Sequence, residues 1–207
     1  MKAILMSIKP KYVVKILNGE KTIEIRKTMP KCKFPIDVYI YCTKDKKLLF
    51  DREQGIYFVG IHNASLDKHS NDTDIFMNTV YEKESCDNLT GKVVAKFTLN
   101  KVEEIKQYIG VFWTWGGHPY YTDNVSEEKL LNRSCLSATE LENYLQGKNG
   151  YAWHIDNLVI FDKPKELSEF RTRHWNSKNP FERDNVYELT RAPQSWCYVE
   201  VHKDVKH

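Results

Sequence analysis

The sequence predicts an α+β fold in which strands outnumber helices. Six short runs are apolar or alternate between apolar and polar residues, which is the pattern of β-strands. Two further runs place apolar residues at helical spacing. A chain of 207 residues suits one domain. We therefore expect a single domain over residues 1–207, with an insertion at residues 44–87.

The chain begins with a predicted strand and a predicted helix. Residues 1–8 form an apolar run typical of a strand, and residues 9–17 have the apolar spacing of a helix. Pro10 suits the first turn of that helix. Gly19 suits its end, because glycine adopts the left-handed backbone conformation without a steric penalty.

Residues 22–26 follow as a half-buried strand. Their polar and apolar residues alternate, so Ile23 and Ile25 are expected to point into a core. The other face is then polar, with Lys21 at its entrance. That face carries Thr22, Glu24 and Arg26. Taken alone, such residues are also typical of a solvated strand face with a cross-strand salt bridge.

The middle of the chain contains two more strands and the insertion. Residues 37–43 are rich in β-branched and aromatic residues and are expected to pair with the 22–26 strand. Residues 92–100 form the next predicted strand. Residues 102–108 either continue this strand or form a short turn. Residues 44–87 between them are rich in charge, Asn and Asp, and this composition predicts an insertion.

The second half contains a capped helix and two strands. Ser137 and Glu140 have the spacing of a capping box, so a helix is expected to begin there and to end before Gly147. Residues 151–161 form the longest predicted strand, and residues 189–200 end in the last one.

An aromatic and glycine-rich loop occupies residues 111–121. Trp113 and Trp115 lie in it beside two glycines, a histidine and two tyrosines. Such a loop suits a platform on which a nucleobase stacks. It suits equally a hydrophobic flap packed onto the core.

Composition limits the classes of protein. The net charge of +3 permits contact with nucleic acid, and eight basic residues gather between residues 9 and 33. Five cysteines without Cys-x-x-Cys spacing argue against a disulfide scaffold and a structural zinc site. No apolar run approaches a membrane span. A cytoplasmic protein with no metal, no cofactor and no membrane contact is therefore expected.

Three runs resemble one family. The pattern Gly-x-Lys-Thr-x-Glu-x-Arg at residues 19–26, the run GYAWHIDNLVIFDKPKEL at 150–167 and the ending RAPQSWCYVE at 191–200 resemble the ASCH domain of the PUA-like superfamily, in its bacterial and phage-associated form. The resemblance implies a small antiparallel β-barrel flanked by helices. It also implies a cleft, lined by the first run, that holds RNA or a modified nucleoside.

Three functions follow from this resemblance. The first is a module that binds RNA or a modified nucleoside in a basic, aromatic-lined cleft. The second is a hydrolase, because small ASCH proteins include an amidohydrolase for N4-acetylcytidine and others are reported as nucleases. Lys21 matches the lysine of that amidohydrolase, but Glu24 stands where it has a threonine nucleophile. The third is a protein-interaction adaptor that makes contact through the 44–87 insertion.

The expected site residues combine the motif with nearby polar and aromatic residues. Lys21 and Glu24 are the catalytic pair if the chain is an enzyme, with Thr22 as a substitute nucleophile or the pair activating water. His154 is the group expected to titrate near neutral pH, although a lone strand histidine is more often structural. The binding residues are Lys9, Lys21, Thr22, Glu24, Arg26, Trp113, Trp115, Trp153, His154, Arg191, Gln194 and Ser195.

Overall fold

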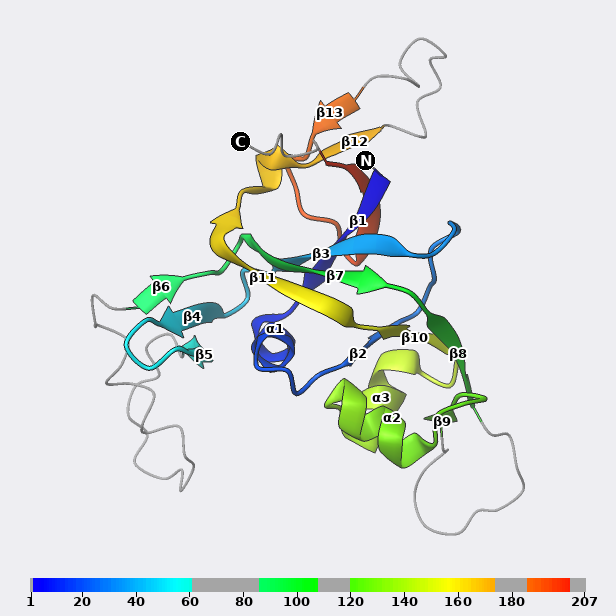
Figure 1. Ribbon diagram of the computed structural model, residues 1–207. Helices are drawn as coiled ribbons and strands as arrows, with labels where there is room; N and C mark the ends of the chain where they lie inside the picture. The colour runs from blue at the N-terminus through cyan, green and yellow to red at the C-terminus, as the bar shows by residue number, and fades with distance from the viewer. Residues whose placement is uncertain (1, 61–85, 108–119, 174–185, 202–207) are drawn as a thin grey trace. The chain divides into compact units, whose positions relative to one another are not determined.

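The computed structural model describes residues 2–60, 86–107, 120–173 and 186–201 (Figure 1). The chain divides into two compact units. Unit 1 comprises residues 1–18, 37–96 and 159–207, and unit 2 comprises residues 19–36 and 97–158. Each unit is therefore built from separate stretches of sequence. The predicted single domain with an insertion stays a prediction.

Unit 1 is organised around a seven-stranded sheet with the order β11-β7-β3-β1-β14-β12-β13. Figure 1 shows β11, β7 and β3 side by side. The strand β1 runs parallel to β3 and antiparallel to β14. The bounds are β1 Lys2–Ile8, β3 Ile36–Cys42, β7 Val93–Leu99, β11 Asp156–Lys165, β12 Arg171–Arg173, β13 Val186–Glu188 and β14 Trp196–Glu200.

One face of this sheet packs around aromatic residues. Ala3 and Leu5 of β1 lie with Tyr39 and Val199 in a buried cluster centred on Phe170. A 3-10 turn at Leu167–Glu169 brings Phe170 into place, where its ring meets Tyr39 edge-on at 5.0 Å. Alternate residues of β1 thus supply one core, as the apolar run predicts.

The predicted pairing of the third strand was wrong. The sequence predicted that residues 37–43 pair with the 22–26 strand, whereas β3 lies between β7 and β1. The reason is that β3 is buried along almost its whole length, as suits a central strand of the large sheet. A short half-polar strand offers it less apolar surface.

The predicted insertion contains a small sheet of its own. Its order is β5-β4-β6, with β4 at Lys47–Asp51, β5 at Ile56–Gly60 and β6 at Cys86–Asn88. The helix α1, Pro10–Leu17, has Pro at its first turn and packs against β4 and β5. The φ of Gly19 is +77°, so the predicted helix stop is confirmed.

Unit 2 is a four-stranded sheet covered by two helices. The order is β2-β10-β8-β9, with β2 at Ile23–Arg26, β10 at Gly150–His154, β8 at Val102–Gln107 and β9 at Tyr120–Tyr121. The helices are α2, Glu127–Ser134, and α3, Ala138–Leu145. In Figure 1 both helices lie beside β8 and β9.

The core of unit 2 lies between its sheet and its helices. Ile23 and Ile25 are 0% and 4% exposed and pack against Leu130 of α2 and Leu141 of α3. The sequence prediction that these two isoleucines face a core is confirmed. Helix α3 begins with the predicted capping box, because Glu140 N–H donates to Ser137 Oγ and Ser137 N–H donates to the Glu140 carboxylate.

The longest predicted strand is two strands. The run at residues 151–161 breaks at Ile155 into β10, in the four-stranded sheet, and β11, in the seven-stranded sheet. Asn157 has a φ of +48° just after the break. Asparagine tolerates this left-handed conformation better than most residues, which lets the strand change direction.

The fold class is mixed α+β, mostly sheet, as predicted. Three α-helices accompany the strands in the described residues. The strand orders of those residues are open, so the barrel implied by the resemblance is not confirmed. Within the described ranges, no helix is long and apolar enough to cross a membrane.

Candidate functional site

The start of β2 is tied to the end of helix α2. The Thr22 N–H donates to the carbonyl of Arg133 at 2.9 Å, and the Thr22 hydroxyl accepts from Arg133 Nε at 3.1 Å. The Thr22 carbonyl in turn accepts from the Ile155 N–H at 3.0 Å. The motif is therefore held in place before its strand begins.

Three charges of the motif form one buried cluster. The Glu24 carboxylate forms two ion pairs. Lys21 Nζ is 3.2 Å from one carboxylate oxygen, and Arg26 Nη2 is 3.1 Å from the other. Lys21 is 2% exposed, and Glu24 and Arg26 are 7% exposed. Charges at this depth need partners, because burial removes them from water. The cluster is therefore a fixed part of unit 2 and no solvated strand face.

Helix α2 supplies a further partner for Lys21. Lys21 Nζ donates to the carbonyl of Ser134, the last residue of the helix, at 2.6 Å. The last carbonyls of a helix have no partner inside it and carry partial negative charge. An ammonium satisfies both the carbonyl and the Glu24 carboxylate. These contacts suit a lysine that holds charge in place.

Tyr144 of α3 adjoins this cluster. Burial raises the pKa of its hydroxyl, the Arg26 charge opposes that rise and the Glu24 charge adds to it. Lys27 Nζ lies 5.2 Å from the centre of the Tyr144 ring, within the range of a cation–π contact. The aromatic ring thus links the buried cluster to the exposed Lys27.

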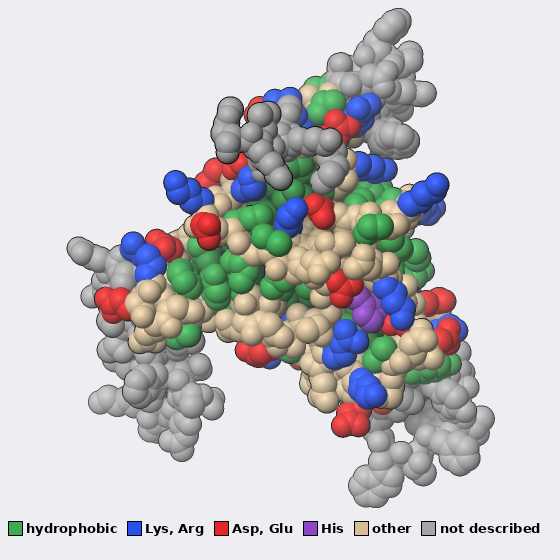
Figure 2. All heavy atoms as spheres, viewed as in Figure 1, with side chains coloured by type: hydrophobic (Ala, Val, Ile, Leu, Met, Phe, Trp, Pro, Cys, Tyr) green, Lys and Arg blue, Asp and Glu red, His purple; other side chains and the backbone are tan. Residues whose placement is uncertain are grey.

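The stretch after β2 concentrates positive charge on the surface. Lys27, Lys31 and Lys33 are exposed, and residues 25–36 contain no acidic residue. Among the described residues, neither Lys31 nor Lys33 has an ion-pair partner. On the face shown in Figure 2, basic and acidic side chains are interspersed. We call residues 27–33 the basic segment.

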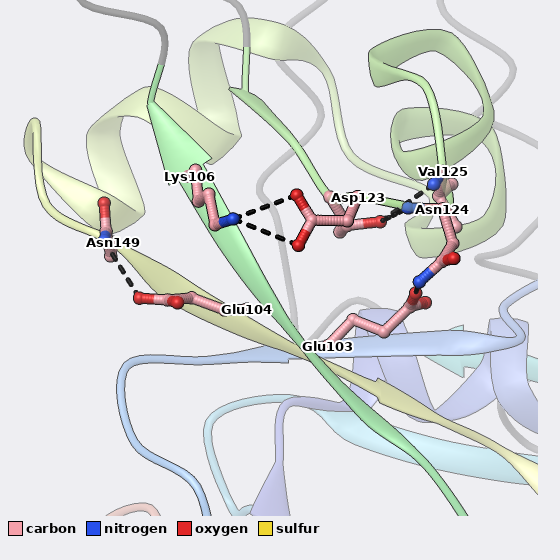
Figure 3. Close-up of polar contacts among 8 residues, drawn as sticks. Glu103, Glu104, Lys106, Asp123, Asn124, Val125 and Asn149 are labelled. Carbon is pink, nitrogen blue, oxygen red and sulfur yellow. Dashed lines mark hydrogen bonds and ion pairs between the residues drawn. The ribbon is translucent and has the colours of Figure 1, made fainter.

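A second polar cluster lies on the other face of the same sheet. Strand register places Trp153 opposite Glu24, and His154 opposite Ile23. Side chains opposite each other share a face, so His154 lies on the helix-covered face, away from Glu24. His154 Nε2 is 2.5 Å from Glu103 Oε2. Asn124 donates to the other Glu103 oxygen, as Figure 3 shows.

Glu103 is held as a carboxylate. Burial acts to raise its pKa, but hydrogen bonds from Lys101, Asn124 and His154 outweigh it, and the net effect is a lowered pKa. Lys101 Nζ is 3.0 Å from Glu103 Oε1. Figure 3 shows the neighbouring contacts of β8, including the Lys106–Asp123 ion pair at 2.9 Å.

Comparisons with known proteins find structural likenesses only. No protein-family model matches the chain, and no curated protein matches it. Among solved structures it is similar to an ASCH protein from Zymomonas mobilis, with 13% identity, 96% of this chain and 87% of that chain covered, and a TM-score of 0.49. Two single-residue mutants of the Zymomonas mobilis protein match at 14% identity, with 96% and 97% of this chain and 88% and 91% of theirs covered, and TM-scores of 0.46 and 0.47.

These solved structures are named as ASCH proteins, and the ASCH domain is the family that the three sequence runs resemble.

Thr22 and Trp153 both lie in unit 2 but in different settings. Thr22 is half-buried and adjoins Arg133. Trp153 is fully buried and donates from Nε1 to the Thr28 carbonyl, so its ring offers no open face to a base. The prediction that Trp153 stacks a ligand is corrected by this burial. Trp113 and Trp115 lie outside the described residues.

The other predicted residues belong to unit 1. Lys9 is exposed at the start of α1, and Arg191 and Gln194 are exposed in the turn before β14. Ser195 is half-buried there, and its carbonyl accepts from the Ser7 N–H at 2.9 Å.

Sequence reasoning missed three participants. Ser134 acts through its backbone carbonyl, which no side-chain pattern signals. Tyr144 falls within the helix predicted after the capping box, and Glu103 within the predicted strand or turn at residues 102–108, and neither was expected in a site. In the described ranges, no group of three His, Cys, Asp or Glu side chains is arranged to hold a metal ion.

Proposed function

We propose that the chain binds RNA or a modified nucleoside through unit 2, with the basic segment as the contact for phosphates. The observation that carries this proposal is a run of exposed lysines without acidic neighbours, placed directly after a rigid ionic cluster. Lysines bind the phosphate backbone by displacing its counterions. Buried Lys21 and Arg26 serve this function by fixing the strand that presents the segment.

Tyr144 suits the recognition of a base at the same place. Its ring is half-buried, and Lys27 lies beside it. Aromatic rings next to basic side chains are typical of surfaces that bind single-stranded nucleic acid. Bases stacking there would add to the phosphate contacts.

The test is the salt dependence of RNA binding. A fluorescently labelled single-stranded RNA is titrated with wild type and with the triple variant Lys27→Ala, Lys31→Ala, Lys33→Ala, and fluorescence anisotropy is followed over a series of salt concentrations. Loss of three phosphate contacts should flatten the plot of log K against log salt by about 2, since each contact on a single strand contributes about 0.7.

A charge-matched control is available. The variant Lys46→Ala, Lys129→Ala, Lys163→Ala removes three exposed lysines elsewhere and changes net charge equally. Its salt slope should stay within experimental error of wild type. Equal slopes for all three proteins would contradict the proposed contact, and absence of salt-dependent binding by wild type would favour the adaptor function, with the 44–87 segment as the contact.

A hydrolase is the second candidate function. The observation that favours it is the 3.2 Å contact between Glu24 and Nζ of Lys21, which matches the lysine of the amidohydrolase that the family resemblance implies. The test is incubation with N4-acetylcytidine, with cytidine and acetate measured by mass spectrometry. A flat result next to an active control enzyme would remove this candidate.

A further inference from the structure

His154 ends β10 at the point where three elements of unit 2 meet. It lies opposite Ile23 of β2, and its backbone N–H donates to the Lys101 carbonyl directly before β8. Its ring nitrogen Nε2 contacts the carboxylate of Glu103 in β8. Helix α2 covers this face, and its residue Arg133 binds Thr22, the neighbour of Ile23. The imidazole therefore lies at the end of the sheet where the motif begins.

The contacts of Glu103 determine which ring nitrogen is available. Glu103 is 6% exposed and stays ionised among three donors, so it acts only as an acceptor toward His154 Nε2. In the neutral imidazole the proton is then on Nε2, and Nδ1 carries the lone pair. A buried carboxylate that orients a histidine in this way is the arrangement of many proton-transfer sites.

Among the described residues, the second ring nitrogen of His154, Nδ1, has no competing partner. The His154 side chain keeps 11% of its surface exposed. Lys101, beside it, is half-exposed and pairs with Glu103. A small molecule that reaches this end of the sheet would meet an oriented base.

Glu24 suits the same role poorly. Both of its oxygens are engaged by cations, Lys21 at 3.2 Å and Arg26 at 3.1 Å. A carboxylate bridged by two cations is a weak base, because protonation would break two buried ion pairs. Its function is to hold the cluster together.

We propose that His154 is the general base and acid of unit 2, with Glu103 as its positioning residue. This inference rests on the hydrolase proposed above as the second candidate function. Nδ1 takes a proton from water as the water oxygen forms a bond to the acyl carbon. The bond from that carbon to the amine nitrogen then breaks, and the nitrogen receives the proton from Nδ1. The products are the carboxylic acid and the free amine, so atoms and protons balance.

The test compares His154→Gln, Glu103→Gln and Glu24→Gln in turnover of N4-acetylcytidine. His154→Gln should lower kcat about 10²- to 10⁴-fold, the usual contribution of general acid–base catalysis, with little change in KM. Glu103→Gln should lower kcat about tenfold with little change in KM, because the neutral amide no longer fixes the orientation of the ring. Lys129→Ala, on the exposed side of α2, is the control expected to match wild type.

If wild type turns the substrate over and the kcat of His154→Gln stays within about threefold of the wild-type value, the proposal is overturned. If wild type shows no turnover, the hydrolase itself is excluded. The reactivity of the His154 ring beside Glu103 is then measured by carbethoxylation with diethyl pyrocarbonate, and the modified residues are located by mass spectrometry. Modification of His154 in the folded protein, slowed in Glu103→Gln, would support a ligand-facing base. A His154 that reacts only after unfolding would overturn it.

Discussion

Glu24 is the residue on which the charges of the motif converge. Alternation along β2 placed it correctly on the face opposite Ile23 and Ile25, but alternation carries no information on depth. Its burial depends on Tyr144 and on the end of helix α2, which lie more than 100 residues away in the sequence. The faces were therefore predictable, and the closed ionic cluster was not.

Lys21→Met should lower the free energy of unfolding by about 3 kcal/mol. The change leaves Glu24 with one partner and the Ser134 carbonyl with none, and breaking a buried ion pair is costly. Denaturant titration measures this difference. Lys27→Met, at an exposed lysine of the same stretch, should change stability by less than about 0.5 kcal/mol. Equal effects of the two substitutions would contradict a structural role for Lys21.

Glu103 should make stability sensitive to acid. Its pKa is lowered in the folded protein, so its contribution is present above the pKa of the unfolded chain and is lost as pH falls through the folded value. Glu103→Gln removes this contribution. The free energies of unfolding of wild type and variant, measured from pH 7 to pH 3, should differ most at neutral pH and converge in acid. A difference that is constant with pH would disprove the linkage.

Local signals predicted elements better than they predicted partners. The Ser137–Glu140 capping box and the Gly19 stop were correct because both depend on a few adjacent residues. The pairing of β3 was wrong, and so was the continuous 151–161 strand, because sheet neighbours are chosen by burial across the whole chain. The short helix α2 carried no cap signal strong enough to be predicted, yet it anchors Lys21.

The cap of α3 should matter mainly to that helix. Ser137→Ala removes the acceptor of the Glu140 N–H and should destabilise the protein by about 1 kcal/mol. The double variant with Glu140→Ala should cost less than the sum of the two single changes, since each side chain serves the other's backbone. Thr139→Ala, exposed in the first turn, is the control. Strict additivity would show that the box does not act as a unit.

At the scale of the whole molecule, the two units share one interrupted chain. The chain passes between them after residues 18, 36, 96 and 158, three times within a strand. No contiguous fragment therefore contains one complete unit alone. This arrangement explains why composition along the sequence showed no domain boundary.

Replacement of residues 44–90 by an Asn-Gly turn should leave the chain folded but less stable. Cys42 already bonds to Gly91 and Lys92, so the ends of the segment lie together. The segment contributes Leu48 and Phe58, which are 0% and 6% exposed, and its strands β4 and β5 contact α1. We expect a loss of at least about 2 kcal/mol in chemical denaturation, the cost of one large core truncation. Unchanged stability would mean that the segment contributes nothing to the core.

The bond between the Thr22 amide and the Arg133 carbonyl has a consequence for motion. A strand normally frays from its end, but here the amide of Thr22, directly before β2, is held by a helix end, and Lys21 bonds to the same helix end through the Ser134 carbonyl. The start of β2 and the last turn of α2 should then open together, as one cooperative unit. Deuterium should accordingly enter the amide of Thr22 and the amides of the last turn of α2 at matched rates, and both sets should speed up together in Lys21→Met.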